Sequence, residues 1–186
     1  MMIASPRSIV RFGFSGLMSS SLVLGGWTMP AAVNAAAAIP ATAAEALAQT
    51  SDEAEIRALT AQWFAAWSPG RGAVDWDAMG ALFVQQSDEL LVFDDAGGSV
   101  VVLTSWDEYR ATWEPFMAQF SAWQIAPEGE IQIRVDGDLA TAVFTLTGGG
   151  VDQVGNTVNF RQRATHIWQR INGRWLIVHE HLTTDG

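Results

Sequence analysis

The chain has 186 residues, a formal net charge of −10 and no cysteine, and all of its Lys and Arg positions are arginines. The lack of cysteine excludes disulfides, thiolate metal sites and a thiol nucleophile. The acidic balance argues against nucleic acid as a partner, because phosphate contacts need a basic surface.

The N-terminal segment resembles an export signal. Arg7 and Arg11 precede an apolar stretch from Phe12 to Trp27, and an alanine-rich run follows Pro30. This order is typical of a secretory signal peptide. We predict a signal peptide over residues 1–35, with cleavage as late as about residue 43, and an Ala/Pro-rich linker over 36–50. The mature protein is then periplasmic or secreted, with no stable membrane insertion; an uncleaved anchor is the alternative.

Residues 51–186 are predicted to form one domain that begins with helices. Apolar residues at helical spacing predict a helix over 52–68, with a capping box at 50–53, and a short helix over 75–83. A third helix is predicted to start at the Ser105-x-x-Glu108 box and to kink or split at Pro115. Its inward face carries Trp106, Tyr109, Trp113, Phe116, Met117 and Phe120.

Strand patterns fill the rest of the domain. Short strands are expected at 89–94 and 99–103, and long ones at 123–135, 139–147, 157–171 and 174–183, with Gly148-Gly149-Gly150 as a turn. Helices followed by a meander of strands indicate an α+β fold with an antiparallel sheet.

The most informative segment is the hairpin at Asn172-Gly173, a two-residue loop that fixes the pairing of its strands. Trp168 should face Ile177, His166 should face His179, and Ala164 should face His181. All three histidines then lie on the inner face, while Glu180 points outward. Leu176, Val178 and Leu182 make the opposite face apolar, which suggests that a dimer partner covers it.

Three histidines on one apolar face have four interpretations. They fit hydrogen-bonded core residues, polar anchors for a ligand, a general acid or base, or zinc ligands. The best catalytic candidates are His166, His181 and Tyr109. No further motif supports a metal or a cofactor, and we predict neither.

The segment from Arg163 to Thr183 resembles the C-terminal pattern of SnoaL-like domains in the nuclear transport factor 2-like superfamily. The matching residues include Thr165, Trp168, Gly173 and Trp175. The resemblance covers roughly residues 52–184. It implies a cone in which a curved antiparallel sheet wraps around about three N-terminal helices, usually as a homodimer. Relatives include cyclases, isomerases, dehydratases, and binding or assembly domains, so the fold alone leaves the function open.

Two narrower resemblances are also present. The association domain of calcium/calmodulin-dependent kinase has a similar final run, but His166 and Leu182 stand where its arginines would be. Iota-class carbonic anhydrases end in a histidine–serine motif. Here the matching run, residues 179–183, lacks the middle histidine and the first serine.

We therefore expect an exported protein that binds a small, largely apolar molecule. Alternatives are an enzyme with a pocket histidine as acid or base, of the lyase, isomerase or carbonic anhydrase type, and a non-catalytic dimerisation module. The predicted pocket residues share aromatic or imidazole side chains: Trp63, Trp67, Tyr109, Trp113, Phe116, His166, Trp168, His179 and His181.

Overall fold

A computed structural model describes residues 43–86, 89–95 and 99–185 of the chain. The predicted signal peptide and the first part of the predicted linker lie outside these ranges. Within them, no helix has both the length and the apolar character needed to cross a bilayer.

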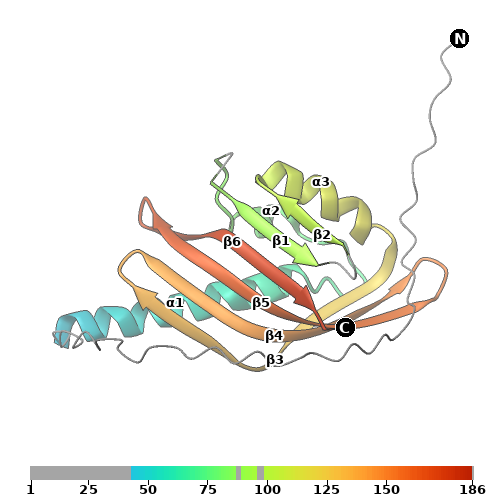
Figure 1. The fold of residues 1–186 in the computed structure, drawn as a ribbon. Helices are drawn as coiled ribbons and strands as arrows, with labels where there is room; N and C mark the ends of the chain where they lie inside the picture. Colours follow the sequence, from blue (N-terminus) through green and yellow to red (C-terminus); the bar gives the residue numbers. More distant parts are fainter. Residues whose placement is uncertain (1–42, 87–88, 96–98, 186) are drawn as a thin grey trace, which may run out of the picture. The chain divides into compact units, whose positions relative to one another are not determined.

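Three helices and six strands build this part of the chain (Figure 1). In chain order they are α1 (Ala43–Ala66), α2 (Trp76–Gly80), β1 (Leu91–Asp95), β2 (Val100–Leu103), α3 (Trp106–Met117), β3 (Phe120–Asp136), β4 (Leu139–Asp152), β5 (Thr157–Ile171) and β6 (Arg174–Thr184). The α+β class is as predicted.

The strands form one sheet in the order β2-β1-β6-β5-β4-β3. Neighbouring strands run antiparallel except β1 and β6, which run parallel, with Leu91 opposite His179 and Asp95 opposite Thr183. The predicted antiparallel sheet is therefore mixed. A parallel pair needs a long connection, which β2, α3 and the strands β3 to β5 provide between β1 and β6. Figure 1 shows β3, β4 and β5 as long, bent strands.

Helix α1 starts at Ala43, so it includes half of the predicted linker. The expected capping box at 50–53 lies inside the helix, because the alanine-rich stretch before it has a high helix propensity. One face of α1 is buried against β3 and β4, with Ile56 and Thr60 fully buried and Trp63 and Trp67 almost so. We call the sheet face that α1 covers the inner face.

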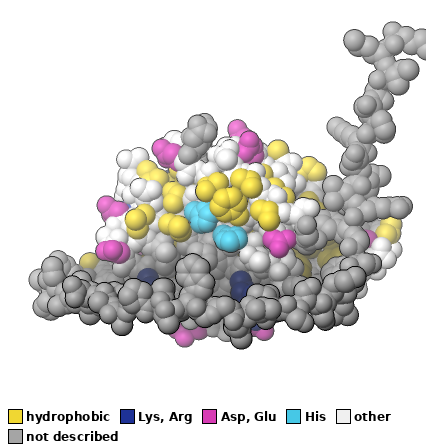
Figure 2. All heavy atoms as spheres, viewed as in Figure 1, with side chains coloured by type: hydrophobic (Ala, Val, Ile, Leu, Met, Phe, Trp, Pro, Cys, Tyr) yellow, Lys and Arg dark blue, Asp and Glu magenta, His cyan; other side chains and the backbone are white. Residues whose placement is uncertain are grey.

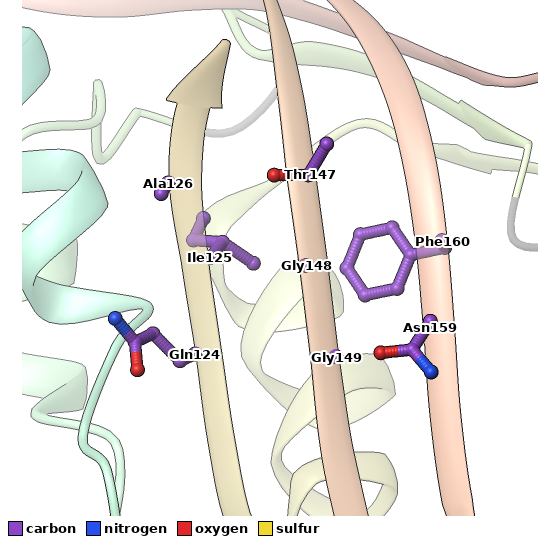
Figure 3. Close-up of a pocket in the computed structure, with 8 residues that line it drawn as sticks. All are labelled: Gln124, Ile125, Ala126, Thr147, Gly148, Gly149, Asn159 and Phe160. Atoms are coloured by element: carbon purple, nitrogen blue, oxygen red, sulfur yellow. The ribbon is translucent and has the colours of Figure 1, made fainter.

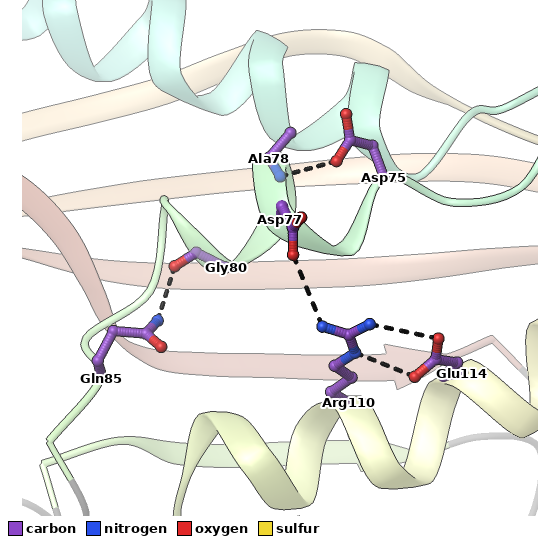
Figure 4. A network of polar contacts seen from close by, with 7 residues as sticks. All are labelled: Asp75, Asp77, Ala78, Gly80, Gln85, Arg110 and Glu114. Atoms are coloured by element: carbon purple, nitrogen blue, oxygen red, sulfur yellow. Dashed lines mark hydrogen bonds and ion pairs between the residues drawn. The ribbon is translucent and has the colours of Figure 1, made fainter.

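Polar contacts cap α2 and α3, and Figure 4 shows the cap of α2 together with the ion pairs of Arg110. Asp75 caps α2 by accepting a hydrogen bond from the backbone N–H of Ala78 at 2.9 Å. Ser105 caps α3 by accepting one from the N–H of Glu108 at 3.2 Å, as the sequence predicted. Arg110 of α3 pairs with Glu114 at 3.0 Å and reaches Asp77 of α2 at 3.7 Å.

Two sequence expectations about chain breaks differ from the structure. Pro115, expected to kink or split its helix, does not split it: it lies inside α3, two residues before the last residue Met117, and removes one backbone N–H donor from the last turn. Gly148, Gly149 and Gly150 lie within β4 and do not form a turn. A Cβ atom on Gly148 would come 2.3 Å from the ring of Phe160, so the glycines make room for aromatic side chains that cross the strand.

Candidate functional site

The β5–β6 hairpin decides which side chains face the interior. Its loop is the predicted two-residue turn, with positive φ at Asn172 (52°) and Gly173 (78°). Trp168 lies opposite Ile177 as predicted. Beyond that pair, however, Ile167 takes the place opposite His179, because Val178 is an extra residue on β6 that forms a β-bulge.

The bulge reverses the predicted orientation of every later residue of β6. Glu180, expected to point outward, lies opposite His166 and is fully buried. His179 and His181, expected inward, fall on the opposite, outer face. The prediction that three histidines converge is therefore wrong: only His166 belongs to the inner face, where it is fully buried.

A buried polar cluster forms where α3 meets β5 and β6. Glu180 accepts a hydrogen bond from the hydroxyl of Tyr109, with 3.0 Å between Oη and Oε1. The other carboxyl oxygen, Oε2, lies 3.2 Å from Nε2 of His166. The geometry between these two atoms does not meet the requirements of a hydrogen bond. Oε2 of Glu180 and the two ring nitrogens of His166 therefore have no hydrogen-bond partner. Three elements thus converge on one carboxylate.

Asp94 of β1 lies at the edge of this cluster and is 9% exposed. Burial, together with the nearby charges of Glu180 and Asp95, raises its pKa from 3.8 to about 8. Gln162 of β5 donates a hydrogen bond to Asp94, at 3.5 Å. Burial, followed by the charges of Glu180 and Asp94, also raises the pKa of Tyr109 well above its usual value. Tyr109 therefore stays neutral and acts as a donor.

Aromatic rings enclose the cluster. The ring of His166 lies 4.8 Å from that of Trp63, 5.0 Å from that of Phe144 and 6.0 Å from that of Trp168. Trp67 lies 6.3 Å from Tyr109. The indole N–H groups of Trp63 and Trp168 are buried and have no acceptor. Buried donors are nearly always paired. The indole N–H groups of Trp63 and Trp168 can therefore each donate a hydrogen bond that the described residues do not accept.

Two other predicted pocket residues belong to a second aromatic group. Trp113 and Phe116 of α3 pack together at 5.6 Å, and Phe116 continues to Trp123 of β3 at 6.0 Å. Trp123 in turn stacks on Phe160 at 5.2 Å. The structure therefore divides the predicted pocket residues between the polar cluster, this second group and the outer face.

His179 and His181 lie on the outer face beside Phe93 of β1, with ring separations of 5.7 and 6.0 Å. Nε2 of His181 is 3.2 Å from Oγ1 of Thr183. Figure 2 shows histidine side chains beside a gathering of hydrophobic ones on this surface. Large apolar residues exposed on β1 and β2 are Leu91 (39%), Val100 (64%) and Val102 (53%).

The zinc interpretation depended on three convergent histidines, and the bulge removes that basis. Among the described residues, no group of three or more His, Asp or Glu side chains is arranged to hold a metal ion.

Two open grooves lie elsewhere on the surface. One, of about 550 Å³, runs over the glycines of β4 (Figure 3), and the other, of about 660 Å³, lies between the start of α1 and β3. The first is lined by residues of β3, β4 and β5, including Gln124, Ile125, Thr147, Gly149, Asn159 and Phe160. None of the residues that line these two grooves is a predicted pocket residue. Neither groove is therefore the predicted pocket.

Sequence reasoning missed Glu180 and Asp94. The bulge leaves no trace in the strand pattern, because Trp175 to Val178 is a continuous apolar run with no alternation that an extra residue could interrupt. The available signal was chemical, since a glutamate between two histidines in an otherwise apolar strand needs a partner wherever it is buried.

The polar cluster can exchange protons, because it joins a carboxylate, an imidazole and a phenol at contact distances. Its second property is its aromatic surroundings, which are closed to solvent: Trp63 is 2% exposed and Trp168 is fully buried. These two properties define the candidate site: Asp94, Tyr109, His166 and Glu180, with Trp63, Trp67 and Trp168 around them.

Comparison with known proteins agrees with this fold. A family model described as the SnoaL-like domain matches residues 56–183. A nuclear transport factor 2 (NTF2-like) superfamily protein from Salmonella enterica serovar Typhimurium LT2 is similar in structure, with a TM-score of 0.64 and 21% identity over 74% of this chain and 93% of that one. No curated protein matches the sequence.

Two further solved structures show the range of proteins with this fold. A provisionally assigned calcium/calmodulin-dependent protein kinase II association domain from Xanthomonas campestris has a TM-score of 0.55 and 20% identity, over 70% of this chain and 86% of that one. A hexachlorocyclohexane dehydrochlorinase, LinA type 2, has a TM-score of 0.61 and 8% identity, over 74% and 87%. At these identities the likeness shows the fold alone.

Proposed function

The chain belongs to the SnoaL-like domain family, and on that premise we propose that its inner face binds a small, largely apolar molecule carrying one polar group. The observation that supports this most is the unused hydrogen-bonding capacity of the interior. Trp63, Trp168, His166 and Glu180 all have buried polar atoms without a hydrogen-bond partner. A ligand with a polar group would satisfy them, while the indole rings would bury its apolar body.

The ligand site in this proposal is narrower than the sequence predicted. It consists of the candidate site, with Trp113 and Phe116 as a neighbouring wall of α3 and without His179 and His181, which lie on the other face. Helix α3 covers the site: Tyr109 stacks on Trp106 at 5.4 Å and packs on Phe83 at 4.9 Å. Entry of a ligand therefore requires α3 to move. The exposed Arg110–Asp77 ion pair adds little resistance to that movement.

A titration with the neutral, apolar fluorophore N-phenyl-1-naphthylamine tests this proposal. We expect its emission to rise on saturable binding of one probe per chain. Trp67→Leu should weaken binding by about 10-fold, because it removes an aromatic wall beside Tyr109. The matched control is Trp175→Leu, since Trp175 is also buried but packs under the guanidinium of Arg170, 4.4 Å away, at the hairpin end. Absence of saturable binding, or equal weakening by both variants, contradicts the proposal.

We also propose that the protein works as a homodimer joined through the outer face of β1, β2 and β6. This face combines exposed Leu91, Val100 and Val102 with Phe93 and the two outer histidines. Two copies of a chain with a net charge of −10 repel each other, so they should associate where apolar side chains dominate; Asp95, opposite Val100, is a carboxylate on this face. The assembly alternative uses this surface and needs no ligand.

Export to the periplasm or medium is likewise a proposal, and it rests on the sequence of residues 1–42. Its test is cell fractionation with N-terminal sequencing of the mature chain. The expected result is a chain that starts between about residues 36 and 44. An intact N-terminus in the cytoplasm would contradict it.

A further inference from the structure

His179 and His181 lie in the middle of the outer face, two residues apart on β6. Their neighbours on the adjoining strands β1 and β5 are mostly apolar: Leu91 and Ile167 beside His179, and Phe93 and Thr165 beside His181. Figure 2 shows the histidines among hydrophobic side chains. In the proposed dimer a second copy covers this region. Both imidazoles then lose water, and buried ring nitrogens need partners.

One copy of the chain supplies two imidazoles to this place. The ring centres of His179 and His181 are 6.4 Å apart. Among the described residues, no third His, Asp or Glu joins them in a group that could hold a metal ion. A homodimer usually has two-fold symmetry, in which both copies use the same surface, so residues near the axis meet their own counterparts. A second copy therefore brings two more imidazoles to the first pair.

From this arrangement we propose that the outer face holds one Zn²⁺ ion between two copies of the chain, bound by His179 and His181 of each copy. The inference rests on the proposed homodimer and adds metal ligation to its apolar contacts. Zinc prefers four ligands in a tetrahedron, and neutral imidazole is one of its ordinary ligands. Because one copy has only half of the site, bound zinc strengthens association.

The spacing of the two rings suits a single ion. Zinc lies about 2.0–2.1 Å from an imidazole nitrogen and hence roughly 3.2 Å from the ring centre, so tetrahedral angles need ring centres roughly 5.2 Å apart. Side-chain rotation can close the observed 6.4 Å to that value, because His181 is exposed and His179 is half-buried. Nε2 of His181 lies 3.2 Å from Oγ1 of Thr183, and the metal replaces that contact with a hydroxyl.

Charge also favours a cation at this place. Four neutral imidazoles leave the ion its full charge, between two chains that each have a net charge of −10. Asp95 lies opposite Thr183, at the end of the same row, and places a carboxylate on this face. Arg163 of β5 also lies opposite Thr183, but its guanidinium pairs with Asp185 at 2.9 Å. Zinc therefore lowers the repulsion that opposes a dimer.

The experiment uses the full chain, treated with EDTA and dialysed, and zinc sulfate as the probe. Analytical ultracentrifugation over a range of protein concentrations gives the dissociation constant of the dimer, and elemental analysis after dialysis gives the bound zinc. We expect one zinc ion for every two chains. The dissociation constant of the dimer should be at least about 10-fold lower with zinc than with EDTA.

The double variant His179→Asn/His181→Asn tests the ligands. It should bind no zinc and should dimerise equally with zinc and with EDTA, because asparagine keeps a polar side chain but removes both imidazoles. His166 remains in this variant and is fully buried, so it cannot replace them. Val154→Asn introduces the same side chain at a position that is 83% exposed and outside this face, and it should match wild type.

Three outcomes overturn the inference. The first is zinc that the double variant still binds, or one zinc ion per chain in wild type. The second is a dimer whose dissociation constant is the same with zinc and with EDTA, which leaves the proposed dimer standing. The third is a chain that stays monomeric under both conditions, which overturns the proposed dimer as well.

Discussion

At the scale of single residues, the molecule concentrates its buried ionisable groups in one place. Asp94, Tyr109, His166 and Glu180 come from α3 and three strands and lie within an aromatic interior. The charge of Glu180 is a cause of the raised pKa of both Asp94 and Tyr109. Changing Glu180 should therefore alter the titration of Asp94 and Tyr109.

Tyr109 provides a direct test of this coupling, because it is the one tyrosine in the sequence. Burial and the adjacent carboxylate raise its pKa well above the usual value of 10.0. We expect no tyrosinate absorbance in the folded chain as the pH is raised past 10, followed by ionisation together with unfolding. The measurement is ultraviolet difference absorbance with circular dichroism in parallel. The denatured chain, which should titrate near pH 10, is the control; tyrosinate at that pH in the folded chain would contradict the prediction.

Asp94 should make stability depend on pH. Its pKa is 3.8 in the unfolded reference and about 8 in the folded chain, so between these values the folded chain holds a proton that the unfolded chain has lost. This contribution to stability is fully present below about pH 4 and is lost as the pH rises to about 8.

Asp94→Asn removes this dependence while keeping an acceptor for Gln162. We expect it to raise the free energy of unfolding on the order of 2 kcal/mol at pH 9, and far less at pH 4. Urea unfolding at both pH values measures the difference. Asp77→Asn, at an exposed side chain, is the control and should show little change. A gain that is the same at both pH values would refute the assignment.

At the scale of elements, aromatic packing shapes the strands more than strand propensity does. Three consecutive glycines weaken a strand, yet β4 runs through Gly148, Gly149 and Gly150. Trp123 and Phe160 on the flanking strands occupy the space that side chains there would need. The bulge in β6 has a similar effect on a single strand, since it lets Ile177 and Glu180 both face inward.

Gly150→Ala should therefore destabilise the sheet. A Cβ atom there would lie 2.6 Å from the ring of Trp123 and 2.7 Å from the backbone oxygen of Ala122, which cannot rotate away. We expect a loss of about 2 kcal/mol or more in the free energy of unfolding. Thr147→Ala, at an exposed position of the same strand, should cost about 0.5 kcal/mol or less. Equal effects in thermal or urea unfolding would show that β3 and β5 adjust freely.

At the scale of the whole molecule, charge and apolar surface act against each other. The formal charge of −10 keeps copies apart, whereas the exposed valines of β2 favour contact. Strand β2 is also an edge strand, because it pairs only with β1. The backbone N–H and C=O groups on its other side are therefore open to pairing with a second chain. Both features locate the proposed dimer contact at the same end of the sheet.

Val102→Glu should convert the dimer to a monomer, because it places a carboxylate in the proposed contact of both copies. Light scattering coupled to size-exclusion chromatography should show the mass of one chain for this variant and of two chains for wild type. Val154→Glu adds the same charge at a more exposed position outside this face and should remain dimeric. Dissociation of both variants, or of neither, would exclude this surface as the contact.

The sequence by itself determined the elements and the family. Helical spacing, the Ser105 cap and the Asn172-Gly173 turn depend on neighbouring residues, so they could be recognised locally, and the pattern over residues 163–183 was enough to identify the SnoaL-like fold. It also predicted that Trp63, Trp67, Tyr109, His166 and Trp168 are buried on one inner face.

Tertiary structure alone decided which polar groups meet. The bulge at Val178 shifts the pairing by one residue, and a shift of one residue moves each side chain to the other face. The inner face therefore received Glu180, while His179 and His181 went to the outer one. The partners of the shifted residues, β1 opposite His179 to Thr183 and Tyr109 of α3 beside Glu180, are distant in sequence, so the spacing along β6 does not show the shift.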